Sequence, residues 1–253
     1  MSEIKLTKED TYRGSLILVT PDFPIREIPK TAKLRSVPGG SDILLKEQAS
    51  AALRALLEDI GCGDEIAAVS GFRTQEEQEK IWEDSMAQNG EAFTRKFVAV
   101  PGCSEHQSGY AIDLARNAGE IDFICPEFPH SGIFGKFRER MAHYGFVERY
   151  AAGKEKITGI GAEPWHFRYV GYPHSMIMTS RGMALEEYME FLRKDTRQEH
   201  PYVFRDGENR IEISYLSLEN EEPVVFELPE SAGYWCSGTN EGGVVVSLFR
   251  GAA

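Results

Sequence analysis

The sequence of 253 residues lacks an excess of positive charge and any long apolar run. Asp and Glu outnumber Lys and Arg by 40 to 28, which gives a net charge of −12. Nucleic acids and anionic membrane surfaces bind to basic faces, so this balance argues against both as partners. No apolar run reaches the ~20 residues that a membrane-spanning helix needs, so we expect no membrane span.

Cysteine is also scarce, and its positions are widely spaced. Cys62, Cys103, Cys125 and Cys236 form no C-x-x-C pair. A secreted disulfide scaffold is denser in cysteine, so we expect four free thiols in a reducing compartment. Cys103 lies close to the histidine segment described below, but no Cys/His/Asn signature marks it as a nucleophile.

The first residues are polar and contain no apolar signal segment. This predicts a cytoplasmic protein, although a truncated exported protein would have the same composition.

The apolar content of 42% is enough for a substantial core, and the length suits one domain with an appendage. After Arg197 the sequence changes to short strand-like runs separated by Asp-Gly and Gly-Gly. We therefore expect a main domain over residues 1–197. A small all-β appendage of about four strands, without an assigned role, is expected over residues 198–253.

The main domain alternates strand and helix patterns, which predicts an α+β fold. Thr74 and Glu77 fit a helix-capping box, and Gly61 is placed to end the preceding helix. The segment 21–41 contains Pro and Gly and is expected to be irregular. We expect strands at 15–20, 66–72, 110–115, 145–147 and 165–170, and helices at 42–60, 74–86, 131–144 and 183–194.

Two segments carry the side chains of a possible metal site. The first, SEHQSGYAID at 104–113, contains His106 and Asp113; the second, EPWH at 163–166, contains Glu163 and His166. A catalytic zinc site needs three protein ligands, an open position for water and a free carboxylate. Mixed His and Asp ligands favour zinc over calcium or magnesium, which prefer oxygen ligands alone.

The local pattern predicts how these groups converge. We expect His106 on a loop and Asp113 on the strand that follows, where small alanine neighbours leave room for a metal. Glu163 and His166 are three residues apart, and an ideal strand would point them to opposite faces. Because Pro164 breaks that regularity, we expect Glu163 in a loop above the same site, as an unliganded general base.

The remaining histidines do not belong to a comparable metal-binding motif. They are expected to be ordinary, hydrogen-bonded polar residues: His130, His143, His174 and His200.

These segments resemble a known family. SEHQSGYAID resembles the S-x-H-x-x-G-x-A-x-D signature of the VanY-type D,D-carboxypeptidases and their VanX and VanXY relatives, and EPWH matches the family's E-x-x-H segment. SGFRTQEEQ at 70–78 resembles its S-G-[YF]-R-[ST]-x-x-x-Q segment. The resemblance covers residues 12–195 and is greatest to the bifunctional VanXY enzymes. It implies a small antiparallel sheet flanked by helices, of the D,D-peptidase/hedgehog-like type.

The resemblance also implies roles for individual residues. It implies three zinc ligands, namely His106, Asp113 and His166. Glu163 would take a proton from water and return it to the leaving amine, and Arg73 would stabilise the oxyanion. Gln78 and Ser104, together with Arg73, would hold the terminal carboxylate of the substrate. A bidentate Arg in a dry site suits an oxyanion, and an acidic protein needs such a local cation.

We therefore expect a zinc peptidase that hydrolyses D-Ala-D-Ala, removes the terminal D-Ala of peptidoglycan precursors, or both, as in glycopeptide resistance. An L,D-carboxypeptidase or an L-Ala-D-Glu endopeptidase would share the metal site. A non-catalytic zinc-containing peptidoglycan-binding module is a third interpretation, but it would have no need of Glu163 as a free carboxylate. The sequence does not predict the oligomeric state.

Overall fold

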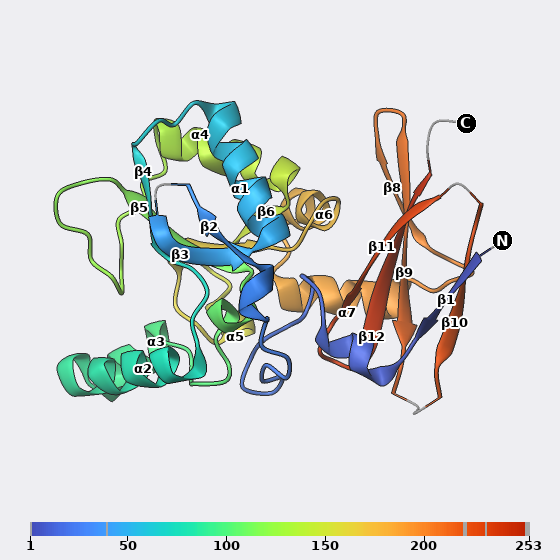
Figure 1. Ribbon diagram of the computed structural model, residues 1–253, viewed down its shortest axis with the longest axis horizontal. Helices are drawn as coiled ribbons and strands as arrows, with labels where there is room; N and C mark the ends of the chain where they lie inside the picture. Colours follow the sequence, from blue (N-terminus) through green and yellow to red (C-terminus); the bar gives the residue numbers. More distant parts are fainter. Residues whose placement is uncertain (1, 39, 220–221, 231, 251–253) are drawn as a thin grey trace. The chain divides into compact units, whose positions relative to one another are not determined.

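The computed structural model describes residues 2–38, 40–219, 222–230 and 232–250 (Figure 1). The chain forms two compact units. The larger unit comprises residues 19–184, and the smaller unit comprises residues 1–18 together with 185–253. This division differs from the expected 1–197 and 198–253, because helix α7 (Leu185–Asp195) and the first residues of the chain belong with the C-terminal strands.

The larger unit is built on a four-stranded antiparallel sheet in the order β4-β5-β7-β6. Its strands are β4 (Ile66–Ser70), β5 (Ala111–Arg116), β6 (Phe146–Tyr150) and β7 (Glu163–Tyr169). A hairpin pairs β2 (Leu34–Val37) with β3 (Gly40–Lys46). The helices are α1 (Glu47–Ile60), α2 (Gln75–Asn89), α3 (Glu91–Phe97), α4 (Ile133–Arg140), α5 (Glu155–Thr158) and α6 (His174–Arg181). The expected α+β fold with a small antiparallel sheet is confirmed.

Short sequence signals set the helix ends. α1 ends at Gly61, whose φ of 64° is left-handed and suits glycine. α2 begins after Thr74, whose hydroxyl accepts from the backbone N–H of Glu77 while the Glu77 carboxylate accepts from the Thr74 N–H. The expected helix start at residue 42 is wrong: residues 42–46 belong to β3, and residues 44–46 pair with β2, which lies in the segment expected to be irregular.

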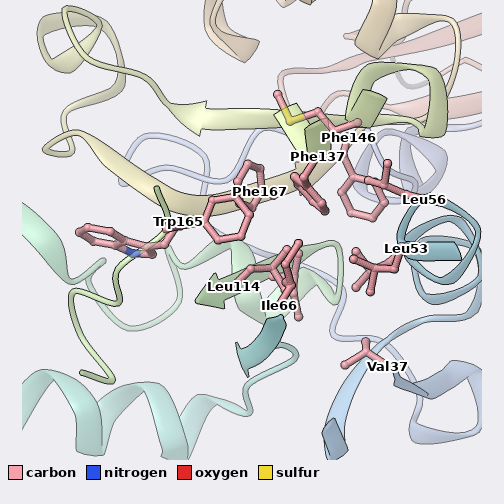
Figure 2. Close-up of a cluster of buried hydrophobic side chains, with 14 of the residues drawn as sticks. Val37, Leu53, Leu56, Ile66, Leu114, Phe137, Phe146, Trp165 and Phe167 are labelled. Carbon is pink, nitrogen blue, oxygen red and sulfur yellow. The ribbon is translucent and has the colours of Figure 1, made fainter. Parts of the chain in front are cut away.

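The core of the larger unit lies between one face of the sheet and helices α1 and α4 (Figure 2). Leu53 and Leu56 of α1 and Phe137 of α4 pack with sheet residues such as Leu114 and Phe167. Side chains alternate along a strand, so Ile112 and Leu114 enter this core while the residue between them points to the other face. The opposite face of β5 is therefore available for polar groups.

The smaller unit has its own core between two sheets. One sheet is ordered β11-β12-β9-β8, and the other pairs β1 (Ser2–Leu6) with β10 (Val224–Leu228). The remaining strands are β8 (Tyr202–Asp206), β9 (Asn209–Ser217), β11 (Gly233–Gly238) and β12 (Gly243–Arg250). Residues 198–253, where about four strands were expected, contribute β8 to β12, and β1 was not expected. Leu216, Phe226, Val246 and Leu248 are buried in this core.

Residues 15–20 do not form the expected strand. Ser15 to Val19 are buried, but the backbone N–H of Leu16 donates to the Ser237 hydroxyl and that of Leu18 to the Thr239 carbonyl. These isolated bonds satisfy the backbone without a ladder. Among the described residues, no helix combines the length and apolar character that crossing a bilayer requires.

Candidate active site

The register of the sheet brings two of the expected metal ligands together. Asp113 of β5 lies directly opposite His166 of β7, and opposite Ser70 of β4 on its other side. Residues that face each other across an antiparallel pair project to the same side of the sheet. This side is the one left free by the apolar core, so a strand that supplies Leu114 to the core presents Asp113 to the site.

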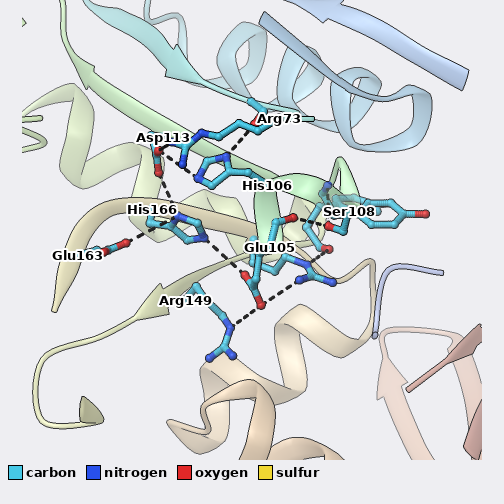
Figure 3. A network of polar contacts seen from close by, with 12 residues as sticks. Arg73, Glu105, His106, Ser108, Asp113, Arg149, Glu163 and His166 are labelled. Atoms are coloured by element: carbon cyan, nitrogen blue, oxygen red, sulfur yellow. Dashed lines mark hydrogen bonds and ion pairs between the residues drawn. The ribbon is translucent and has the colours of Figure 1, made fainter. Parts of the chain in front are cut away.

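His106 completes a cluster of three possible metal ligands (Figure 3). It lies in a short 3₁₀ turn, Glu105–Ser108, rather than in an irregular loop. One oxygen of Asp113 is 3.1 Å from His106 Nε2, and the other is 2.9 Å from His166 Nδ1. The three side chains are all buried, and their ligand atoms lie within 4.8 Å of one another.

The cluster fits a zinc ion in its donor types and in the orientation of its rings. A tetrahedral zinc with bonds of 2.0–2.1 Å separates its ligand atoms by about 3.3 Å, close to the separations from Asp113. The Nδ1 of His106 lies 2.7 Å from the Gly71 carbonyl oxygen, which can only accept a hydrogen bond, so Nδ1 carries the proton and Nε2 keeps the lone pair that faces Asp113. Two imidazoles and one carboxylate leave a fourth position open for water or substrate.

Glu163 lies beside this cluster without belonging to it. Its Oε2 is 3.8 Å from His166 Nδ1, and the side chain is 7% exposed. The expected loop position is wrong, because Glu163 is the first residue of β7 and pairs with Tyr150. Three residues of β7 (164–166) lie opposite Arg149 alone, and this bulge rotates Glu163 toward the side of His166.

The titrating groups of the site have shifted pKa values. Burial raises the pKa of Glu163 to about 8, so this carboxyl group can take up and release a proton near neutral pH. Burial, together with Arg73, lowers the pKa of His106 to about 4. Burial opposes the charged form of His166, but hydrogen bonds to Asp113 and Glu105 outweigh it and raise its pKa to about 9.

Arg73 lies at the strand-to-helix corner expected from the sequence and reaches into the site. Its Nη2 is 3.1 Å from Asp113 Oδ2, its Nε donates to the Ser70 hydroxyl at 2.8 Å, and its Nη1 donates to Gln78 Oε1 at 3.3 Å. The side chain is 13% exposed. Three anchored nitrogens hold the guanidinium in one orientation, with its charge close to the metal cluster.

A cavity of about 40 Å³ lies in front of these groups. Arg73, His106, Asp113, Glu163 and His166 all contribute to its wall, and so does Ser104. The expected substrate-binding residues are thus placed differently, because Gln78 is fully buried and is not among the described residues that line this cavity. Its amide oxygen accepts from Arg73 and its nitrogen donates to the Ala99 carbonyl, so Gln78 stands behind Arg73.

Sequence reasoning missed a set of buried charges behind His166. Glu105 is fully buried and contacts Arg149 Nε at 2.8 Å and Arg168 Nη1 at 2.9 Å. Burial opposes its ionisation, but the two arginines hold the pKa of Glu105 well below its usual range. The adjacency of Glu105 to His106 was the only sequence signal. Cys103 is a free thiol whose pKa is raised by burial, which disfavours the reactive thiolate.

Comparison with known proteins identifies the family. The model of the VanY family, described as D-alanyl-D-alanine carboxypeptidase, matches residues 42–172. The bifunctional D-Ala-D-Ala dipeptidase and carboxypeptidase VanXYC of Enterococcus gallinarum is 40% identical over 187 residues, which cover 73% of this chain and 98% of the relative. The chain belongs to the VanY family. The expected resemblance is therefore confirmed.

Two solved structures of vancomycin-resistance enzymes extend the comparison. The vancomycin-resistance D,D-dipeptidase VanXYg, in complex with a D-Ala-D-Ala phosphinate analogue, matches with a TM-score of 0.93 and 44% identity over 98% of this chain and 99% of its own. A VanY D,D-pentapeptidase variant from a VanB-type resistance cassette, in complex with Zn(II), matches with a TM-score of 0.55 and 31% identity. That match covers 69% of this chain and 98% of the VanY chain.

Proposed function

We propose that this protein is a zinc D,D-peptidase that hydrolyses D-Ala-D-Ala, removes the terminal D-Ala from peptidoglycan precursors, or does both. The observation that carries the proposal is the position of Glu163, a buried and unliganded carboxylate beside three possible zinc ligands. A structural metal site needs no such neighbour. The named activities of VanXYC and VanXYg support the choice of substrate, and the Zn(II) complex of a VanY supports the metal.

His106 Nε2, Asp113 and His166 Nδ1 would hold the zinc ion. When bound there, zinc supplies Lewis-acid chemistry that makes water a nucleophile at neutral pH and polarises the scissile carbonyl. Glu163 takes a proton from the attacking water as the new C–O bond forms. It then returns that proton to the amide nitrogen as the C–N bond breaks, so no net proton is gained or lost.

Arg73 would stabilise the negative charge that develops on the carbonyl oxygen, since it lines the cavity and is fixed by three partners. Ser104, which also lines the cavity, would bind the terminal carboxylate of the substrate with Arg73. Gln78 would act through Arg73, because both ends of its amide are engaged within the protein. The small cavity suits a residue with a short side chain.

The decisive experiment measures release of D-Ala by the zinc-loaded protein. It uses D-Ala-D-Ala, a muramyl pentapeptide ending in D-Ala-D-Ala, and L-Ala-L-Ala as a stereochemical control. We expect D-Ala from at least one of the first two substrates, none from the third, and loss of activity after chelation. No release at full zinc occupancy would overturn the proposal in favour of a binding module.

Mass spectrometry of digested muropeptides distinguishes the related peptidases. Cleavage of an L,D bond, or of the L-Ala-D-Glu bond, without release of terminal D-Ala would identify a different peptidase. The proposal also places the enzyme in glycopeptide resistance, in keeping with the vancomycin-resistance enzymes it resembles, and in the cytoplasm, as its polar first residues suggest. Cell fractionation, and vancomycin susceptibility of a host that expresses the protein, test these two parts.

A further inference from the structure

Glu105 is a buried carboxylate that the proposed reaction does not use. Its side chain is 0% exposed, and its two oxygens have different partners (Figure 3). Oε1 accepts from Arg149 Nε at 2.8 Å and faces Arg168 Nη1 at 2.9 Å. Oε2 lies 3.4 Å from His166 Nε2. Both arginines therefore act on one oxygen, and the other oxygen is directed at the histidine ring.

His166 is held at both of its nitrogens. Its Nδ1 is 2.9 Å from Asp113 Oδ1, on the side of the possible metal ligands, while Nε2 points away from them toward Glu105. An ionised carboxylate can only accept a hydrogen bond, so it requires the proton on Nε2. A neutral imidazole protonated at Nε2 has its lone pair on Nδ1.

The two histidines thus use opposite nitrogens, and each is fixed by a different acceptor. His106 directs Nδ1 to the Gly71 carbonyl and is left with Nε2, whereas His166 directs Nε2 to Glu105 and is left with Nδ1. A carboxylate behind a metal-binding histidine fixes the ring and raises its basicity. Two arginines contact the other oxygen of that carboxylate, at 2.8 Å and 2.9 Å, and so orient the oxygen that faces His166 as a hydrogen-bond acceptor.

We propose that Glu105 is a positioning residue that fixes the Nε2–H tautomer of His166 and so makes Nδ1 the metal-binding nitrogen. This inference rests on the zinc site of the proposed function. Glu105 contributes to the cavity wall, but its carboxylate oxygens face Arg149, Arg168 and His166, so we assign it no contact with the reacting atoms. It acts through His166, and Arg149 and Arg168 hold it in place.

The first test measures zinc affinity by competition with a chromophoric chelator at one pH. Glu105→Ala removes the acceptor and should weaken zinc binding by about 10- to 100-fold. Glu105→Gln keeps an oxygen that can accept from Nε2 and should recover part of this loss. Glu212→Gln is the matched control, since Glu212 is also a largely buried carboxylate between two arginines, at 2.8 Å from each, but lies in the smaller unit.

Wild-type affinity in Glu105→Ala, or an equal loss in Glu212→Gln, would overturn the proposal. The second test needs no change at Glu105 and so does not depend on how its variants fold. In the ¹⁵N spectrum of the zinc-loaded protein, assigned with His166→Gln, we expect a proton on Nε2 of His166 and a metal-shifted Nδ1. A proton-free Nε2 bound to zinc would contradict the proposal.

These readouts also separate the inference from the function on which it rests. A wild-type protein that binds no zinc would overturn both. Zinc binding and D-Ala release by the wild type, with unchanged zinc affinity in Glu105→Ala, would overturn only the role of Glu105.

Discussion

Replacement of Glu163 by Gln separates proton transfer from metal binding. The amide has nearly the shape of the carboxyl group, so the cavity wall is kept, but it does not accept a proton at neutral pH. The separation of 3.8 Å between Glu163 Oε2 and His166 Nδ1 is too long for a hydrogen bond, so no ligand loses a partner. The variant should therefore bind zinc as the wild type does and fail in the chemical step.

The expected magnitude follows from the two transfers assigned to this one group. A positioned general acid or base contributes about 10²- to 10⁴-fold to the rate. Glu163 would serve as base toward water and as acid toward the leaving amine, and the described residues that line the cavity include no second free carboxylate. We therefore expect a loss of kcat near 10⁴-fold, or about 5 kcal/mol of barrier.

The assay follows D-Ala release at saturating D-Ala-D-Ala and counts zinc per chain by elemental mass spectrometry. Asp113→Asn is the contrasting variant. Asp113 contacts both histidines, so its change should remove zinc and activity together. A Glu163→Gln enzyme that keeps more than about one tenth of kcat would refute the reasoning, because a loss below about tenfold is smaller than the smallest general-base effect. So would loss of zinc in parallel with activity.

Three further outcomes are expected. Arg73→Lys keeps the charge but not the three anchored nitrogens, so kcat should fall by about 10²- to 10³-fold at unchanged zinc content, and a loss below about threefold would contradict the oxyanion role. Phe167→Ala removes a fully buried ring from the core and should lower the free energy of unfolding in urea by about 3–5 kcal/mol, whereas a loss under about 1 kcal/mol would show that the core is not packed as described. Burial lowers the pKa of His174 to about 3, below the unfolded value of about 6.5, so its stabilising contribution is present above pH 6.5 and is lost as pH falls toward 3. At pH 5 the cost is about 2 kcal/mol relative to pH 7.5, and His174→Gln should reduce the acid sensitivity of urea unfolding by that amount; equal pH dependence in both proteins would contradict this.

Local signals in the sequence predicted much of the fold. The capping box at Thr74 and the glycine stop at Gly61 depend on neighbouring residues only, and both are found in the structure. Strand β1 was not predicted, because Ser2–Leu6 is short and polar and is a strand only through its pairing with β10 more than two hundred residues later. Pairing also overrode helical periodicity at 42–46, where the backbone is held in a hairpin.

The candidate site could be predicted where a group lies on a strand of alternating polar and apolar residues, or beside a residue that interrupts the strand. Asp113 between two apolar core residues indicates a polar face, and Pro164 indicates an irregularity beside His166. The sequence could not show that the irregularity is a bulge inside β7, since a bulge is defined by the pairing with β6. The roles of these residues remain predictions, which the Glu163 and Glu105 variants test.

Charge pairing in the site was beyond prediction for a physical reason. The net charge of −12 suggested one isolated cation, but the structure pairs Arg73 with Asp113 and surrounds Glu105 with two buried arginines. Partners 40 to 63 positions apart are brought together by the sheet register, which no local pattern reveals. Breaking a buried pair leaves an uncompensated charge, which costs about 3–5 kcal/mol. Truncation to alanine at these positions therefore measures lost pairing as well as lost function, and isosteric changes such as Glu to Gln are needed to isolate the chemistry.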